Sequence, residues 1–288
     1  MSKNNKNIEI LNIPLSELKP FEDNPFKVRL DESMDELTES VQQSGVLSPI
    51  IARPNKDGGY EILSGHRRAK ACEIAGIKAV PVVVKDFDDD TAAILLVDSN
   101  LHRENILPSE KAYAYQMKLE AMKRQGARSD LTCGQFVHKT QNDKSRDEIG
   151  VQSGESGRQI QRYIRLTNLI YPILDMVDNK EIAMNAAVEI SYLGSKEQTD
   201  VLKAIESEEV APSIEQAKKL RRFSENGRLN SDVALSIMQE QKPEKIRITL
   251  KEDRLMKYFP KTFSPKQMEE TIEKLLANWA RKRNEPER

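Results

Sequence analysis

The chain has 288 residues, enough for two or three domains of ordinary size rather than one large core. Its formal net charge of -1 excludes a uniformly basic nucleic-acid coat, and no apolar run approaches the roughly 18 residues of a membrane span. Two cysteines, Cys72 and Cys133, lie far apart without metal-ligand spacing, which argues against a disulfide framework or a zinc site. Since residues 1–7 are also polar, we expect a modular cytoplasmic protein that does not bind membranes.

Residues 8–98 mix short β-rich runs with helical stretches, which predicts a small mixed α/β domain. The first helix is expected to start at a capping-box pair, Ser33 with Glu36. Thr91 is the expected N-cap of a later apolar helix, behind an acidic run that suits the helix dipole. The expected strands lie at 8–13, 50–53, 60–63 and 80–84, and the expected helices at 33–45, 67–75 and 92–97.

From Pro108 onward the pattern is almost wholly helical and the charge balance turns basic. Residues 109–168 carry 11 lysines and arginines against 7 acidic residues, whereas residues 1–98 carry 12 against 17. Phosphate contacts are therefore expected in the middle of the chain. The expected features are a helix over 109–125, a loop within 126–144, a helix-turn-helix over 146–166, a helix capped by Ser213 and Gln216 that runs through 223, and breaks at Asn226, Gly227 and Pro243.

The stretch 146–166 reads as a helix, a glycine-containing turn and a second helix. Ser156 is the expected N-cap of the second helix, Gln159 the partner that completes a capping box, and three residues face inward: Ile160, Ile164 and Leu166. Arginine suits guanine edges and phosphates, and glutamine pairs with adenine. The candidate DNA contacts are Ser156, Arg158, Gln159, Gln161, Arg162 and Arg165, of which the last lies late enough in the helix to be structural. A charged solvent face is the competing interpretation.

Residues 243–288 are expected to form a small C-terminal unit with a β-like run at 246–250. Its helix starts with Ser264 as N-cap and Pro265 at the first helical position, and its apolar face comprises Met268, Ile272, Leu275, Leu276 and Trp279. So short an apolar helix needs a partner surface, which is either its own domain or a second copy of the chain.

Three short motifs in the N-terminal part carry the candidate chemistry: 45–50, 65–68 and 100–105. In the second, Gly65 follows a strand and opens a helix, so phosphate oxygens could approach the backbone amides there. Arg67 and Arg68 add cationic donors beside those amides. Cations at a helix N-terminus oppose the dipole, which favours an anionic ligand over the alternative of a solvated first turn.

In the third motif, Asn100 offers an oxygen ligand to magnesium, and His102 and Arg103 can reach phosphate, although many polar turns contain such residues. The order G-V-L-S-P-I, then S-G-H-R-R-A-K-A, then S-N-L-H-R-E-N-I resembles the ParB partition-protein family, across about residues 8–195. In that family the three segments form a pocket for CTP and magnesium. The resemblance assigns the metal to Asn100 and nucleotide contacts to Gly45, Ser48, Gly65, His66, Arg67, Arg68, Asn100, His102 and Arg103.

Two positions depart from the family pattern. Ser48 stands where many members have glutamine, and Ser99 where many have glutamate. Serine lacks the carboxylate and the reach that would position water or assist metal-dependent hydrolysis. We therefore expect CTP binding with weak CTPase activity at most.

The resemblance implies a homodimer that loads at a centromere-like DNA site, closes on CTP and magnesium, and slides along the duplex of a chromosome, plasmid or mobile element. The recognition helix matches as well, down to its Arg165-Leu166 ending. A ParA-type ATPase is the usual partner in the family. The segment that activates that ATPase is normally a basic N-terminal tail containing arginine, whereas the only basic residues among 1–7 of this chain are lysines. Two alternatives remain: a helix-turn-helix regulator without nucleotide gating, and a sulfiredoxin-like enzyme, which would need a cysteine where this chain has Gly65.

The expected fold class is α+β. A small mixed α/β domain of the ParB/sulfiredoxin type is expected at 1–107, and an all-α helix-turn-helix domain at 108–225. The small C-terminal unit at 243–288 is a candidate dimerisation element.

Overall fold

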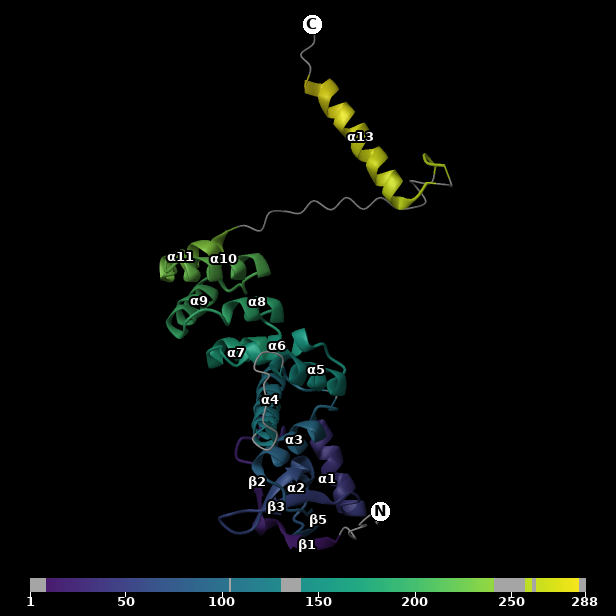
Figure 1. The fold of residues 1–288 in the computed structure, drawn as a ribbon, viewed down its shortest axis with the longest axis vertical. Coiled ribbons are helices and arrows are strands. Elements are labelled where there is room, and N and C mark those ends of the chain that lie inside the picture. The colour runs from purple at the N-terminus through teal and green to yellow at the C-terminus, as the bar shows by residue number, and fades with distance from the viewer. Residues whose placement is uncertain (1–8, 104, 131–140, 241–256, 261–262, 285–288) are drawn as a thin grey trace. The chain divides into compact units, whose positions relative to one another are not determined.

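The computed structural model describes residues 9–103, 105–130, 141–240, 257–260 and 263–284 (Figure 1). The chain divides into two compact units, 1–240 and 241–288. The first contains a mixed sheet followed by many helices, so the predicted α+β class is confirmed. The further division of this unit at residue 107 stays a prediction.

A five-stranded sheet in the order β1-β5-β3-β4-β2 forms the N-terminal part. β1 (Ile10–Pro14) pairs antiparallel with β5 (Ala79–Val84), which runs parallel to β3 (Ile50–Pro54), and β3 pairs antiparallel with β4 (Tyr60–Ser64). These four strands match the predicted runs. The edge strand β2 (Leu18–Pro20), parallel to β4, is not predicted because three residues are too few to show alternation.

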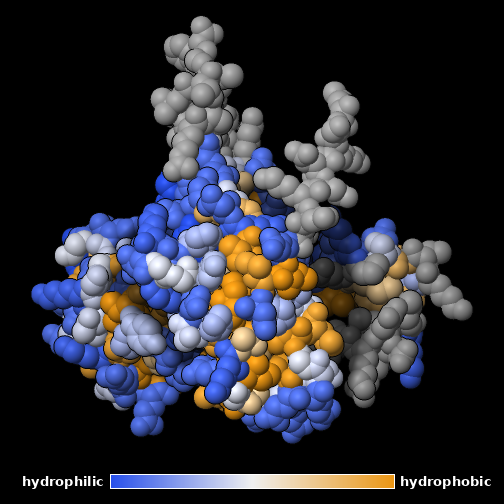
Figure 2. Space-filling view, turned by 90° about the horizontal axis from the view of Figure 1, so that it is seen from below, coloured by the Kyte–Doolittle hydropathy of each residue, from blue (hydrophilic) through white to orange (hydrophobic). Residues whose placement is uncertain are grey.

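Helices α1 (Glu32–Ser44) and α2 (His66–Ile74) pack against the sheet, and α3 (Asp89–Asn100) follows β5. The core between them is aliphatic. Its fully buried members include Met34 from α1, Cys72 from α2, and Ile50, Ala52, Val80 and Val82 from the strands. In a view from below that of Figure 1, apolar residues gather in a patch among hydrophilic ones (Figure 2).

Two predicted helix starts are wrong by two or three residues. Asp31, and not Ser33, caps α1, because its Oδ1 accepts a hydrogen bond from the Met34 amide at 3.1 Å. Asp88, and not Thr91, caps α3, because its Oδ1 accepts from the Thr91 amide at 2.7 Å. In both cases an aspartate lies just before the serine or threonine, and its carboxylate also suits the positive end of the helix dipole.

The helical part begins with α4 (Pro108–Asp130). It continues with α5 (Gln141–Ser153), α6 (Gly157–Leu166), α7 (Tyr171–Asp178), α8 (Met184–Ile190), α9 (Ser195–Glu208), α10 (Ile214–Glu225) and α11 (Ser231–Gln239). Within 126–144, where a loop is expected, residues 126–130 and 141–144 are helical; residues 131–140 lie outside the described residues, so the loop stays a prediction. The capping box of Ser213 and Gln216 is confirmed at the start of α10.

α4 packs against both parts of the unit. Ala114 lies in a buried cluster with Phe26 and Val97 of the sheet domain. One residue further on, Tyr115 lies in a second buried cluster with Ile149 of α5 and, from α6, Ile160. Between these clusters the Lys118 ammonium is almost completely buried and donates to Asp98 of α3 and Gln152 of α5.

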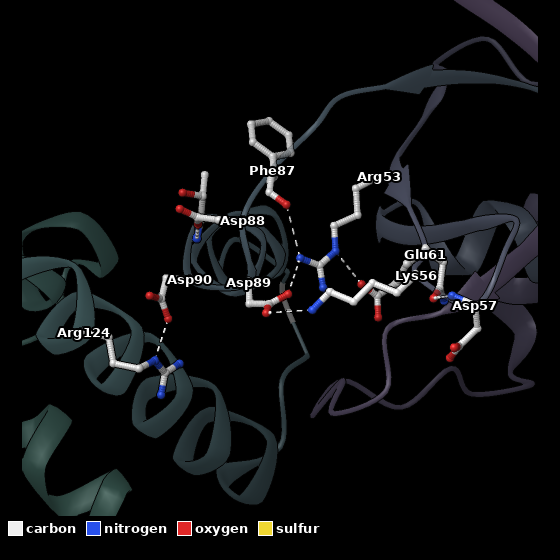
Figure 3. A network of polar contacts seen from close by, with 11 residues as sticks. Arg53, Lys56, Asp57, Glu61, Phe87, Asp88, Asp89, Asp90 and Arg124 are labelled. Carbon is white, nitrogen blue, oxygen red and sulfur yellow. Dashed lines mark hydrogen bonds and ion pairs between the residues drawn. The ribbon is translucent and has the colours of Figure 1, made fainter. Parts of the chain in front are cut away.

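The acidic start of α3 is tied to elements on both of its sides (Figure 3). The Arg53 guanidinium of β3 contacts Asp89 Oδ1 at 2.7 Å and Glu61 Oε2 at 2.6 Å. The next carboxylate, of the buried Asp90, contacts Arg124 Nε of α4 at 2.6 Å. The acidic run therefore fixes α3 through ion pairs, in addition to the dipole effect expected from the sequence.

The second unit contains helix α13 (Pro265–Asn284). Ser264 and Gln267 cap it reciprocally. Leu275, Leu276 and Trp279 are each more than half exposed among the described residues of this unit. The expected β-like run at 246–250 lies outside the described residues. Among the residues placed by the structure, no helix is both long and apolar enough to cross a membrane.

Candidate functional sites

Gly65 forms the turn between β4 and α2 with a left-handed backbone conformation. Its φ is +105°, a conformation that L side chains rarely adopt, and it serves as the N-cap of α2. A Cβ built on it would lie 3.0 Å from Arg68 Nη2 and 3.2 Å from Ile50 Cγ1. The turn thus needs glycine both for its backbone conformation and for the close approach of its neighbours.

Arg68 joins the first two motifs. Its Nη1 donates to the carbonyl oxygens of Ser48 and of Pro49, the latter at 2.9 Å. Burial is the main cause that lowers the pKa of this guanidinium. The Ser48 side chain is exposed, and Gly45 ends α1 with a φ of +69°. The segment 45–50 is therefore held beside the start of α2, as the resemblance requires of a shared pocket.

Arg67 points toward the start of α1. Its Nη2 donates to Ser33 Oγ at 2.5 Å and lies 3.8 Å from Asp31 Oδ1. Among the described residues, its buried Nε has no hydrogen-bond partner. Buried polar groups in proteins are almost always paired, so this guanidinium retains donor capacity for a further acceptor.

His66 is 5% exposed and accepts a hydrogen bond at Nε2 from the Phe21 amide at 3.4 Å. Burial, and then the charge of Arg103, lower the pKa of this imidazole to about 4. His66 is accordingly neutral near pH 7. It can shape the turn or donate from Nδ1, but it adds no positive charge there.

The third motif lies at the end of α3. Asn100, its last residue, is 3% exposed and donates from Nδ2 to Leu96 O at 2.7 Å and Ser99 Oγ at 3.2 Å. His102 is exposed, whereas Arg103 is half-buried with its guanidinium 5.8 Å from the Phe26 ring. Within the described parts of the chain, no group of three or more His, Cys, Asp or Glu side chains could hold a metal ion. A magnesium ion would fit only with phosphate and water as most of its ligands, which is its usual preference.

The charged groups of the second and third motifs shift one another's pKa values. The pKa of Arg103 is lowered first by burial and then by the charge of Arg67, while Glu110 raises it. The pKa of His66 responds to Arg103 in the same sense. Arg67 and Arg103, which are 36 positions apart in sequence, therefore create one positive region, in which a bound anion would relieve the repulsion.

Helix α6 carries the predicted DNA contacts. Ser156 caps it by accepting from the Gln159 amide at 3.2 Å, as predicted. The predicted capping box is wrong, because the Gln159 side chain instead donates to Met184 Sδ at 3.5 Å. The inward face is confirmed by Ile160 and Leu166, which are fully buried, and by Ile164, which packs against the cluster of Ile160. Four of the candidate contacts are exposed: Ser156, Arg158, Gln161 and Arg162.

Arg165 lies at the other end of α6 and is turned toward the protein. Its Nη2 donates to Ser191 O at 2.9 Å, and its guanidinium lies 3.9 Å from the centre of the Tyr192 ring. Arg221 of α10 lies 3.6 Å from the same ring. At such short distances the two guanidiniums must stack on opposite ring faces, so Tyr192 joins α6 to α10. The sequence gives no signal of this contact, since the three residues are scattered over 57 positions.

The described cysteine offers no nucleophile for sulfiredoxin-like chemistry. Cys72 is fully buried in the core, and burial raises the pKa of its thiol. A thiolate is needed for such chemistry, and the position beside His66 is occupied by Gly65. Cys133 lies outside the described residues.

Comparisons with known proteins agree with these motifs. The family model described as the ParB N-terminal domain matches residues 1–101. The chromosome-partitioning protein Spo0J of Thermus thermophilus is 31% identical over 212 residues, which cover 74% of this chain and 70% of that protein. Two structures of the C-terminally truncated chromosome-partitioning protein ParB from Caulobacter crescentus are each 22% identical and cover 74% of this chain and 98% of theirs. The one complexed to the centromeric parS site has a TM-score of 0.44, and the one complexed with CTP-gamma-S a TM-score of 0.32.

Proposed function

The chain belongs to the ParB family, and on that premise we propose that it is a sequence-specific DNA-binding partition protein whose grip on DNA is gated by CTP and magnesium. The observation that carries the proposal is the positive region around Gly65. There the buried Nε of Arg67 has no hydrogen-bond partner among the described residues, and Arg68 of the second motif donates to the first motif. Such a region suits a polyphosphate, which offers many acceptors and several negative charges.

In this proposal the start of α2 binds the triphosphate. The glycine turn lets phosphate oxygens reach the backbone amides, and the three guanidiniums of Arg67, Arg68 and Arg103 supply charge-assisted hydrogen bonds. Neutral His66 shapes the turn, while Gly45 and Ser48 border the nucleotide. Asn100 would ligate magnesium, which supplies charge neutralisation between phosphates when bound, and His102 contributes a further donor.

We expect hydrolysis to be slow. Ser99 Oγ donates to the Leu96 carbonyl of its own helix at 3.0 Å, and Ser48 is exposed without a carboxylate nearby in the contacts described. Neither side chain can serve as a general base at neutral pH. CTP would then act mainly as a ligand that shifts the population toward a closed state.

DNA is read by the exposed N-terminal part of α6. Arg158, Gln161 and Arg162 present guanidinium and amide groups that suit base edges in the major groove, and Ser156 and Gln159 lie at the same helix end. Arg165 is left with a structural role. Arg158→Ala or Arg162→Ala should abolish binding to the centromere-like site, while Arg68→Ala should spare it and eliminate CTP-dependent closure.

A homodimer would complete the clamp. The exposed apolar side chains of α13 offer one contact surface, because Leu275 is 62% and Leu276 58% exposed among the described residues. Leu276→Glu should shift the protein toward a monomer in sedimentation experiments, whereas a variant that stays dimeric would place the interface elsewhere.

A ParA-type ATPase remains the expected partner.

The test titrates the purified protein with each nucleoside triphosphate in magnesium by calorimetry, with and without cognate DNA. A preference for CTP is expected. Site-specific cross-linking of the N-terminal domains should then increase with CTP and DNA together. If no triphosphate binds in either condition, the proposal of gating fails, and a helix-turn-helix regulator without nucleotide control is left.

A further inference from the structure

Arg67 is already engaged by an acceptor from the protein itself. Its Nη2 donates to Ser33 Oγ at 2.5 Å, and the Ser33 hydroxyl proton goes to Asp31 Oδ1 at 2.8 Å. The Arg67 guanidinium and the Asp31 carboxylate are 3.8 Å apart. A relay from guanidinium through hydroxyl to carboxylate therefore links the phosphate motif to the N-cap of α1.

This relay satisfies Arg67 only in part. Guanidinium has five donor hydrogens, and its buried Nε finds no partner among the described residues. Asp31 is itself shared, because it also accepts the Met34 amide that starts α1. A phosphate group would offer Arg67 more oxygens and more charge than one hydroxyl and one distant carboxylate.

We propose that Asp31 and Ser33 form an internal acceptor that competes with the triphosphate for Arg67 and lowers the affinity of the pocket. The inference rests on the proposed CTP binding and names two residues of that site which the motifs do not include. Two effects act together. Turning Nη2 toward phosphate would break its bond to Ser33 Oγ, and the Asp31 carboxylate repels the incoming anion.

The same geometry would also fit the opposite role, in which the relay holds Arg67 ready for the ligand. The two roles predict opposite signs. If Asp31 competes, removing its charge tightens CTP binding; if it preorganises Arg67, the same change weakens binding. A gain in affinity is informative because misfolding cannot produce it.

The test is Asp31→Asn, since asparagine caps a helix as well as aspartate and can still accept from the Met34 amide. Calorimetry with CTP and magnesium should show binding about twofold to fivefold tighter than in the unaltered protein, the range of a partly exposed ion pair. The gain should be smaller for CMP, which carries less charge, and smaller at high salt. Ser33→Ala, which retains the carboxylate, should give a weaker gain.

Asp88→Asn is the matched control, because Asp88 caps α3 in the same way at the opposite end from Asn100. It should leave CTP affinity unchanged. Equal or weaker CTP binding by Asp31→Asn overturns the competition. Failure of the unaltered protein to bind CTP would instead refute the proposed function, so the two failures are distinguishable.

Discussion

Replacing Gly65 by alanine tests the turn on which the nucleotide pocket depends. Two costs add up. The first is conformational, because a φ of +105° is strained for any residue with a Cβ. The second is steric, because the new methyl group would lie 3.0 Å from Arg68 Nη2 and 3.2 Å from Ile50 Cγ1. Ile50 is fully buried and cannot move aside, so Arg68 must shift away from the carbonyls that it contacts.

The chain contains a control that separates these costs. Gly76, just past the end of the same helix, has a φ of +73°, but a Cβ there meets nothing within 4 Å. Gly76→Ala should cost only the conformational part, about 1–2 kcal/mol. Gly65→Ala should lose roughly 1–2 kcal/mol more, because the charge-assisted hydrogen bonds of a half-buried Arg68 are weakened.

Urea denaturation of both variants measures the two unfolding free energies, and CTP calorimetry measures the pocket. Gly65→Ala should bind CTP at least about tenfold more weakly, whereas Gly76→Ala should bind it normally. Suppose instead that the two variants are equally stable and bind CTP equally well. The close packing around Gly65 would then have no energetic importance, and the idea that Arg68 and Ile50 require glycine at this position would be refuted.

Three further predictions concern stability. The pKa of His66 is lowered from its ordinary 6.5 to about 4, so on acidification the unfolded chain takes up this proton before the folded chain does. The free energy of unfolding should therefore be highest above pH 6.5 and fall by about 2 kcal/mol by pH 5. His66→Gln should remove this loss when denaturation is measured at both pH values. Asp98→Asn leaves the buried Lys118 ammonium without its negative partner, whereas Lys118→Met leaves only the half-exposed Asp98 carboxylate. The first variant should therefore be less stable by about 1–3 kcal/mol, and equal melting curves would contradict this. Tyr192→Leu removes the stacking of Arg165 and Arg221 on the ring and should lower the free energy of unfolding by about 1–2 kcal/mol. Tyr192→Phe keeps the ring and should melt like the unaltered protein.

The sequence predicts elements whose signals are repeated along several turns. α1 shows this well, because Met34, Leu37 and Val41 recur at helical spacing and Gly45 stops the helix. Its exact start is not predictable, since the neighbouring Asp31 and Ser33 both have the right spacing to cap a helix. The choice depends on how the preceding chain approaches, which is a tertiary property.

The candidate sites were predictable in residue type but not in orientation. The order of the three motifs indicates one pocket, yet nothing in the sequence places Arg67 against Ser33, which lies 34 positions earlier. The orientation of Arg165 is equally unpredictable. Its position in the helix allows a DNA contact, but its guanidinium instead stacks on the ring of Tyr192, 27 residues later. Such pairings depend on the packing of helices far apart in the chain, which local patterns do not encode.

The shared helix α4 has a consequence for exchanging recognition modules between relatives. Ala114 is buried against the sheet domain and the adjacent Tyr115 against the helix-turn-helix, so both interfaces run along one continuous rod. A chimaera joined before Pro108 would replace one side of the first interface and keep the other. A junction after Asp130 would keep the Ala114 interface but replace Ile149 and Ile160 opposite Tyr115, so either chimaera must also transfer the residues that face α4 across the junction.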